Sequence, residues 1–154
     1  MKLYNFLKPE LVSINCQESN TEDLLREMVH LLKLEKAISN ENLIFKKLVE
    51  REKLGSTSIG NHSAVPHTKV KELKEPIICI CVSQTGIMYH ESDKEPVHLI
   101  ILILSPNYSP IIHLQILAAA ASLIKKSHLI KDILSSKTPD ELINIIKKYE
   151  ASDD

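Results

Sequence analysis

The sequence predicts an α/β fold in which a small mixed β-sheet is sandwiched between α-helices, within a single domain that spans residues 1–154. Apolar residues recur at helical spacing in the first and last thirds of the chain, whereas the middle third holds two short apolar runs typical of covered strands. The chain has the length of one domain and shows no internal repeat or linker. Helices, then strands, then helices along the chain indicate packed layers.

The first third is predicted to contain a short strand and two helices. Residues 11–15 are the expected strand. The first helix is expected within residues 19–38, because this segment opens with helix-capping residues and its leucines fall at helical spacing. The second helix begins at Ser39 or Asn40 and ends near Lys53, and the glycine at position 55 is its C-terminal stop signal.

The middle third is predicted to form the sheet. Residues 76–83 and 97–104 are short apolar runs, and the second is nearly continuous, as in a strand covered on both faces. The segment between them, "GIMYHES", favours a short edge strand. Cys79 and Cys81 share one face of the first strand, so they are expected to be buried thiols rather than a disulfide or a CxxC metal pair.

The last third is predicted to be helical. Ser109 and Pro110 supply an N-cap and a first-turn proline for a long helix. Ser127 is the expected cap of a short helix that runs through Leu134. Residues 138–141, "TPDE", form a capping box with proline at the first helical position, and they predict a final helix.

Composition and charge exclude several classes of function. The net charge is −1 and aromatic residues make up 4% of the chain, so neither a basic face nor a stacking surface for nucleic acid is expected. The longest apolar run, residues 99–104, is too short to span a bilayer, and the N-terminal residues lack the pattern of a signal peptide. The histidines show no metal-ligand spacing. We therefore expect a cytoplasmic protein without nucleic acid, stable membrane association or a metal.

Residues 55–69, "GSTSIGNHSAVPHTK", contain two of the chain's three glycines. A turn rich in Gly, Ser and Thr directs backbone N–H groups and hydroxyls toward one point, which suits an anion. No Gly-Lys-Ser/Thr follows, so the segment is not a nucleotide-binding P-loop. Pro66 biases Val65 to extended geometry, so His67 leaves the strand end in a restricted direction. The residues alone fit either a functional histidine or a turn that ends in an incidental one.

The stretch from Arg51 to His67, "REKLGSTSIGNHSAVPH", resembles the phosphorylation-site signature of the mannitol/fructose class of enzyme IIA proteins of the sugar phosphotransferase system. That class includes the nitrogen-regulatory enzyme IIA. Three further pieces follow in the order and spacing of the family, and together they cover essentially the whole chain. These pieces are Gly86, Ile87 and Tyr89; Asp93, Pro96, Val97, Leu99 and Ile100; and His113, Leu114 and Leu117.

The resemblance implies a phosphoryl-transfer site. It implies that His67 is the phosphoacceptor, as a tele-phosphohistidine, with His113 beside it and Arg51 as a third member of the site. A histidine is neutral near pH 7 and its phosphoramidate stays reactive, as a reversible carrier requires. The hydroxyls of Ser56 and Thr57 are expected to complete the phosphate-binding shell. No cofactor is needed if the donor is another phosphohistidine.

The chain departs from the family pattern at several positions. Ser58 replaces a usual glycine, and His62 and Ser63 stand where small or apolar residues are more common. Met88 and His90 flank the aromatic residue of the third piece, where acidic residues are frequent. These changes leave the chemistry intact and leave the partner open. No motif position supports a role for His62, which is expected to be a solvated side chain near the site.

The expected function is that of a phosphotransferase-system component that accepts phosphate from phosphorylated HPr or its nitrogen-branch relative. The "LGSTSIGN" stretch most resembles the nitrogen-regulatory branch, for which the expected partner is a regulated target protein. One alternative is a free-standing fructose- or mannitol-type enzyme IIA that serves sugar transport by passing phosphate to a sugar-specific enzyme IIB. A second is an interaction module that has lost phosphotransfer. A hydrolase is disfavoured, because no convincing carboxylate partner or serine nucleophile accompanies the histidine pair.

Overall fold

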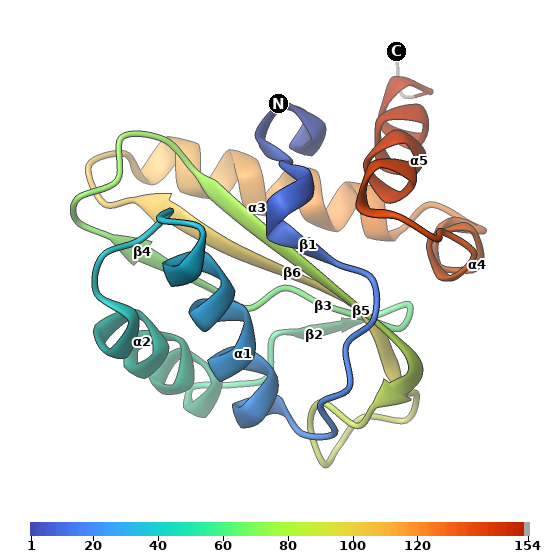
Figure 1. Cartoon of the computed structure of the whole chain (residues 1–154), viewed down its shortest axis with the longest axis horizontal. Helices are drawn as coiled ribbons and strands as arrows, with labels where there is room; N and C mark the ends of the chain where they lie inside the picture. The colour runs from blue at the N-terminus through green and yellow to red at the C-terminus, as the bar shows by residue number, and fades with distance from the viewer. Residues whose placement is uncertain (153–154) are drawn as a thin grey trace.

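The computed structural model, which describes residues 1–152, places helices on both faces of a six-stranded mixed sheet (Figure 1). Helices α1 and α2 pack on one face, and α3, α4 and α5 pack on the other. The predicted α/β sandwich is therefore confirmed. The helices are α1 (Thr21–Leu34), α2 (Glu41–Lys53), α3 (Pro110–Ile124), α4 (Leu129–Leu134) and α5 (Pro139–Ala151), preceded by the short 3-10 helices η1 (Leu3–Phe6) and η2 (Pro9–Leu11). The strands are β1 (Val12–Ser13), β2 (Ser58–Gly60), β3 (Ser63–Ala64), β4 (His67–Val70), β5 (Ile77–Ile87) and β6 (Val97–Pro106).

The sheet is built around an antiparallel pair, β5 and β6, in which Ile80 pairs with Ile101. The strand order is β1-β5-β6-β3-β2, and β1 runs parallel to β5. Strands β3 and β4 both run parallel to β6, and β4 begins where His67 pairs with Ile103. The segment that contains Pro66 therefore crosses from one short strand to the next along a single edge of β6.

Alternate residues of β6 enter two separate hydrophobic cores, as expected for a strand covered on both faces. Ile100 and Leu102 pack with α1 and α2, whereas Ile101 and Ile103 pack with α3, α4 and α5. All four side chains are fully buried. Strand β6, whose Ile103 pairs with His67, is thus packed between helices on both faces.

The three cysteines are free and buried, and all of them lie in the core beneath α1 and α2. Cys79 and Cys81 share that core, which confirms that they occupy one face of β5. Burial raises the pKa of the Cys79 thiol to about 12.

Most of the predicted helix starts are confirmed by cap hydrogen bonds. The side chains of Asn20, Asn40, Ser109 and Thr138 each accept a backbone N–H from the residue three positions ahead. Such a bond satisfies one of the free N–H groups in the first turn of a helix. In the last of these caps, the Glu141 carboxylate accepts from the N–H of Lys137, one residue before the cap.

The prediction of an edge strand in "GIMYHES" is wrong. Strand β5 continues to Ile87, and residues 88–96 form an irregular connection to β6. Gly86 has a φ of +84° and lies within a register shift of the β5–β6 pair, whose last pair is Ile87 with Val97. Beyond it, Tyr89 turns inward and is 5% exposed, and the N–H of His90 is bound by the carboxylate of Asp93. Polar groups of this segment therefore bind side chains, as His90 binds Asp93, or the segment's own backbone, as the N–H of Asp93 binds the carbonyl of His90.

The prediction that Ser127 caps the short helix is also wrong. Helix α4 begins at Leu129, and its N-cap position is His128, whose φ is +70° and whose side chain makes no cap hydrogen bond. The N–H of Leu129 is bound instead by the carbonyl of Lys126. A backbone turn takes the place of the side-chain cap, so this start has no sequence signature.

The two ends of the described chain meet at one buried carboxylate. Glu150, which is 4% exposed, accepts the N–H of Leu3 at 2.7 Å and the N–H of Tyr4 at 2.8 Å. These donors are first-turn N–H groups of η1, which lack partners within the helix. Helix α5 is thereby joined to the N-terminal segment, and both ends lie on the same side of the molecule (Figure 1).

Candidate functional site

His67 is the first residue of β4 and follows Pro66, whose carbonyl accepts the N–H of Ile103 at 2.9 Å. The Nδ1 atom of His67 lies 2.6 Å from the carbonyl oxygen of Val65. A carbonyl oxygen only accepts, so Nδ1 carries the proton and donates. The Nε2 atom of the neutral ring therefore holds the lone pair. The orientation of the ring, which the sequence predicts to be restricted, is fixed by the hydrogen bond to the carbonyl of Val65.

The pKa of His67 lies below its usual value, chiefly because burial disfavours the charged ring. The hydrogen bond to Val65 raises the pKa, and the positive charge of Arg51 lowers it. The carboxylate of Glu52 raises it in turn. The net shift keeps His67 neutral near pH 7, which is the protonation state of a nucleophile.

His113 lies in the first turn of α3, where its N–H binds the carbonyl of the cap residue Ser109. Its ring centroid is 5.7 Å from that of His67, with 51° between the ring planes. The pKa of His113 is lowered by burial first, and then by His67 and Lys69. Its Nδ1 atom is buried and has no hydrogen-bond partner within residues 1–152. The two predicted histidines are thus brought together, as neutral rings.

Arg51 stands in the last turn of α2 and donates from Nη1 to the carbonyl of Gly55 at 2.8 Å. This bond spans the turn after the helix and fixes the direction of the guanidinium. The charge of Arg51 lowers the pKa of His67, so the guanidinium acts on the ring. A guanidinium has five N–H donors in a planar fork, which suits the oxygens of a phosphoryl group.

The turn that follows α2 holds Ser56 and Thr57, and these two side chains have different surroundings. Ser56 is half-buried, and its Oγ accepts the N–H of Ser58 at 3.1 Å. Thr57 is 3% exposed, and both its hydroxyl and its N–H donate to the carboxylate of Glu52. The carbonyl of Thr57 accepts the N–H of Val65 at 2.9 Å. Thr57 therefore joins the turn to the segment that carries His67, and its donors are already occupied.

Glu52 and Tyr89 lie within the motif pieces of the sequence, but no role was assigned to either of them. The hydroxyl of Tyr89 donates to Glu52 at 2.7 Å and lies 3.0 Å from the hydroxyl of Thr57. Burial raises the pKa of Tyr89, which keeps its hydroxyl protonated as a donor. The available signals were a carboxylate directly after Arg51 and a tyrosine in a polar loop, and neither indicates the other as its partner.

His62 lies apart from the two histidines of the site. Its Nδ1 is 2.9 Å from the carbonyl of Pro96, and its Nε2 is 3.4 Å from the carboxylate of Glu95. Its neighbour Ser63 pairs with Leu99 near the start of β6, whereas His67 pairs further along that strand. His62 therefore belongs to the contact between the turn after β2 and residues 88–96.

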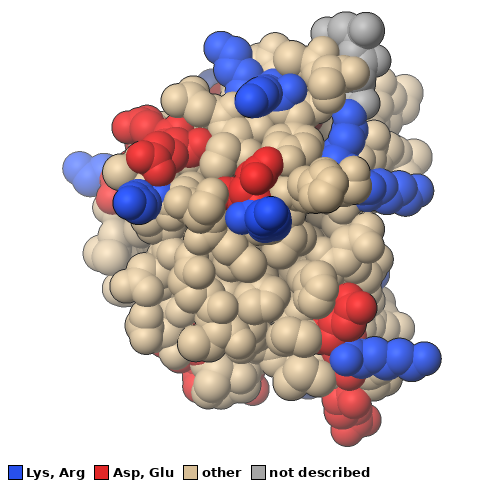
Figure 2. Space-filling model, turned by 90° about the vertical axis from the view of Figure 1, so that its right-hand side faces the viewer, with Lys and Arg blue, Asp and Glu red and all other residues tan. Residues whose placement is uncertain are grey.

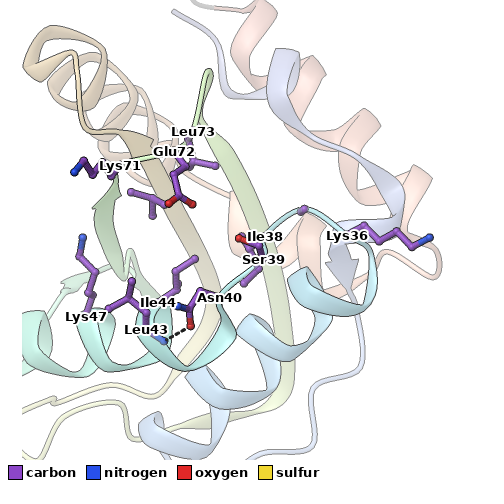
Figure 3. A pocket seen from close by; sticks show the side chains of 12 residues that line it. Lys36, Ile38, Ser39, Asn40, Leu43, Ile44, Lys47, Lys71, Glu72 and Leu73 are labelled. Atoms are coloured by element: carbon purple, nitrogen blue, oxygen red, sulfur yellow. Dashed lines mark hydrogen bonds between the residues drawn. The ribbon is translucent and has the colours of Figure 1, made fainter.

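A pocket of about 320 Å³ lies between the start of α2 and the segment that follows β4 (Figure 3). Asn40, Leu43 and Ile44 line it from the helix side, and Glu72 and Leu73 line it from the other. In the close-up, the cap bond between Asn40 and Leu43 lies at its edge. None of the predicted site residues lines this pocket. The histidine pair is therefore a separate feature of the molecule.

Most of the chain matches the model of a known family. Residues 5–149 match the family model described as "Phosphoenolpyruvate-dependent sugar phosphotransferase system, EIIA 2". The chain belongs to this family. The resemblance seen in the sequence is confirmed, and the protein is a component of the phosphotransferase system of the EIIA type.

Relatives of this EIIA protein fall into two kinds. A nitrogen regulatory protein of Pseudomonas aeruginosa is 27% identical over 146 residues, which are 95% of each chain. A fructose-specific EIIABC component of Bacillus subtilis is 27% identical over 150 residues, which are 97% of this chain and 24% of that protein. The EIIA protein thus spans about a quarter of the second relative.

Solved structures share the fold of this EIIA protein. The nitrogen regulatory protein IIA-Ntr of Neisseria meningitidis aligns with a TM-score of 0.84 at 24% identity, over 94% of this chain and 98% of that one. The IIA mannitol structure of Escherichia coli aligns with a TM-score of 0.77 at 20% identity, over 91% of this chain and 98% of that one. In residues 1–152, no helix combines the length and apolarity needed to cross a membrane.

Proposed function

We propose that this EIIA protein carries a phosphoryl group on Nε2 of His67, as a single IIA domain over residues 1–154. The observation that carries the proposal is the 2.6 Å contact between Nδ1 of His67 and the carbonyl of Val65. It directs the lone pair to Nε2, and the product is a tele-phosphohistidine. Arg51 and His113 stand beside the same ring and support the assignment.

The transfer step moves a phosphoryl group between two histidine rings. The Nε2 lone pair of His67 attacks phosphorus, the P–N bond of the donor phosphohistidine breaks, and its electron pair returns to the donor ring. The Nδ1–H of His67 keeps donating to Val65, which offsets the positive charge that the ring gains. Arg51 and His113 stabilise the charge on the phosphoryl oxygens, which is the main demand of this chemistry.

The surroundings of the site support a protein as the phosphate donor. Leu54, next to the α2 end, is 85% exposed, and Ile111 and Leu114, on either side of His113, are 68% and 66% exposed. Exposed apolar side chains grouped near reactive residues mark a docking surface for a protein partner. We propose phosphorylated HPr, or its nitrogen-branch relative, as the donor, and the cytoplasm as the compartment.

The regulatory nitrogen branch is the role that we propose. The "LGSTSIGN" stretch resembles that branch, and the nitrogen regulatory protein of Pseudomonas aeruginosa is covered over 95% of its length. In this role the phosphorylated state of His67 is read by a regulated target protein. A transport role is supported by a different observation, the similarity to the fructose-specific EIIABC component. In that role the acceptor is an enzyme IIB, as in the solved complex of Escherichia coli IIAMTL with phosphorylated IIBMTL.

Incubation with phosphoenolpyruvate, enzyme I and HPr tests the proposed function. Intact mass measurement is expected to detect one added phosphate, labile in acid and stable in alkali, as for phosphohistidine. His67→Ala removes the adduct, whereas the matched control His62→Ala retains it. An acid-stable adduct, or one that persists in His67→Ala, contradicts the assigned site. If neither HPr nor its nitrogen-branch relative adds phosphate to the wild-type protein, the alternative of an interaction module that has lost phosphotransfer is supported.

Co-purification separates the two roles that remain. Recovery of a sugar-specific IIB protein together with this protein favours the transport role.

A further inference from the structure

The carboxylate of Glu52 receives three hydrogen bonds next to the candidate site. Its Oε1 accepts from the hydroxyls of Tyr89 and Thr57, and its Oε2 accepts the Thr57 N–H at 3.1 Å. An ionised carboxylate is purely an acceptor and has room for all three donors. The bonds fix both oxygens, so the position of this negative charge is determined by two residues from different parts of the chain.

Tyr89 reaches Glu52 from residues 88–96, which lie 37 positions further along the sequence. Its side chain is 5% exposed, and its carbonyl accepts the hydroxyl of Thr21 at 2.5 Å. Asp93 ties the same segment to the turn, because its Oδ1 accepts the hydroxyl of Ser58 at 2.6 Å. The tyrosine is therefore anchored from its own backbone, and Glu52 has little freedom to rotate away.

Hydrogen bonds lead from Glu52 to His67 through two residues. Thr57 donates to the Glu52 carboxylate, the Thr57 carbonyl accepts the N–H of Val65 at 2.9 Å, and the Val65 carbonyl accepts from Nδ1 of His67 at 2.6 Å. The charge of Glu52 therefore acts close to the His67 ring. It raises the pKa of that ring, while the adjacent Arg51 lowers it. Opposite charges from consecutive residues of α2 therefore act on the same imidazole. The effect on a phosphorylated ring has the reverse sense: Arg51 attracts the phosphoryl oxygens and Glu52 repels them.

We propose that the negative charge of Glu52, whose position is fixed by Tyr89, limits how tightly the phosphoryl group is retained on His67. This inference rests on the proposed function. The repulsion raises the free energy of the phosphorylated state and favours onward transfer. In that step the acceptor's nucleophile bonds to phosphorus, the P–Nε2 bond breaks, and its electron pair returns to Nε2. Nδ1 keeps its proton throughout, so the ring leaves the reaction neutral.

The test compares Glu52→Gln and Tyr89→Phe with the wild-type protein. Glu50→Gln is the matched control, because Glu50 is an exposed glutamate of α2 and the variant has the same change in charge. The first readout is the titration of His67 in the unphosphorylated protein, followed by NMR. The second is the equilibrium between this protein and phosphorylated HPr, measured as the fraction of each that carries phosphate.

Glu52→Gln is expected to lower the pKa of His67 and to shift the phosphoryl equilibrium toward this protein by about threefold to tenfold, the range of a partly screened neighbouring charge. Tyr89→Phe keeps the charge but releases its position, so its shifts are smaller and of the same sign. Glu50→Gln leaves both readouts unchanged. A role in stability alone would lower the melting temperature without moving either readout, and that result overturns the proposal. If Glu52→Gln fails to fold, Tyr89→Phe decides the question by the same two readouts.

The two proposals fail in different ways. If the wild-type protein takes up no phosphate from any carrier, the proposed function is wrong, and the inference about Glu52 is wrong with it. If the wild-type protein is phosphorylated on His67 and Glu52→Gln has the wild-type equilibrium, only the role of Glu52 is overturned.

Discussion

Replacement of His113 by alanine is expected to slow phosphoryl uptake by His67 while leaving the fold intact. The Nδ1 atom of His113 has no partner among the described residues, so the variant breaks no hydrogen bond of that atom. The loss of a half-buried ring from the first turn of α3 costs about 1 kcal/mol of folding free energy, which is the typical effect of a point substitution.

The effect on rate is larger, because the ring lies 5.7 Å from that of His67, centroid to centroid. A phosphoryl group on Nε2 comes within reach of a donor on His113. Removal of one such contact to a charged transition state costs about 3 kcal/mol, which corresponds to about a hundredfold in rate. Onward transfer is expected to slow as well, because the same contact is lost in the return step.

Stopped-flow measurement of transfer from phosphorylated HPr gives this rate directly. Thermal unfolding of the variant serves as the control for folding, and His62→Ala serves as the control for loss of a histidine outside the site. A His113→Ala rate within about threefold of the wild-type rate, less than 1 kcal/mol of barrier, would show that the ring makes no contact with the transferred group.

Three further outcomes are expected. Arg51→Lys keeps the charge but loses the planar guanidinium fork, so its transfer rate is expected to fall between that of the wild-type protein and that of His67→Gln, which accepts no phosphate. A wild-type rate for Arg51→Lys contradicts a contact of the guanidinium with two phosphoryl oxygens. The lowered pKa of His67 implies that acceptance is lost at low pH with a midpoint below pH 6.5, the ordinary value of the ring, because the protonated ring has no lone pair on Nε2; a midpoint at or above pH 6.5 contradicts this sign. Binding to the donor protein is expected to weaken only modestly with salt in titration calorimetry, because the net charge is −1. The face on the α4 and α5 side shows basic and acidic side chains around a broad area without charged residues (Figure 2). A steep loss of affinity with salt contradicts an apolar interface.

Features of the fold that depend on neighbouring residues were predictable from the sequence. The cap at Asn40 and the cap at Thr138 need only a side chain and an N–H three residues ahead, so both were evident in the sequence. The inward turn of Tyr89 was not, because its partner Glu52 is 37 positions away and the loop gives no local sign of the contact. The start of α4 at Leu129 is set by a backbone bond, which any residue at position 127 allows.

The candidate site divides in the same way. The Pro66 step restricts His67 by local sterics, and the family resemblance implied that His113 lies beside it. The residues alone did not indicate which ring nitrogen holds the lone pair, because this depends on where the carbonyl of Val65 points; the tele assignment came from the resemblance. The phosphate-binding role expected for Ser56 and Thr57 stays a proposal, and the Thr57 hydroxyl must leave Glu52 to fulfil it. The type of a residue shows which hydrogen bonds its side chain can make, but only the tertiary structure shows which of those bonds are already made to other residues.

The buried carboxylate of Glu150 holds the N-terminal segment beside helix α5, so the fold does not depend on which of its elements comes first along the chain. It binds Leu3 from 147 positions away and Tyr4 from 146, so this contact carries one of the largest loop-closure costs in the molecule. Because the two segments adjoin, a short linker between the ends yields a circular permutant. New ends opened in the exposed turn at Lys74 and Glu75 leave β4 and α3 uncut, so both rings of the histidine pair stay on intact elements.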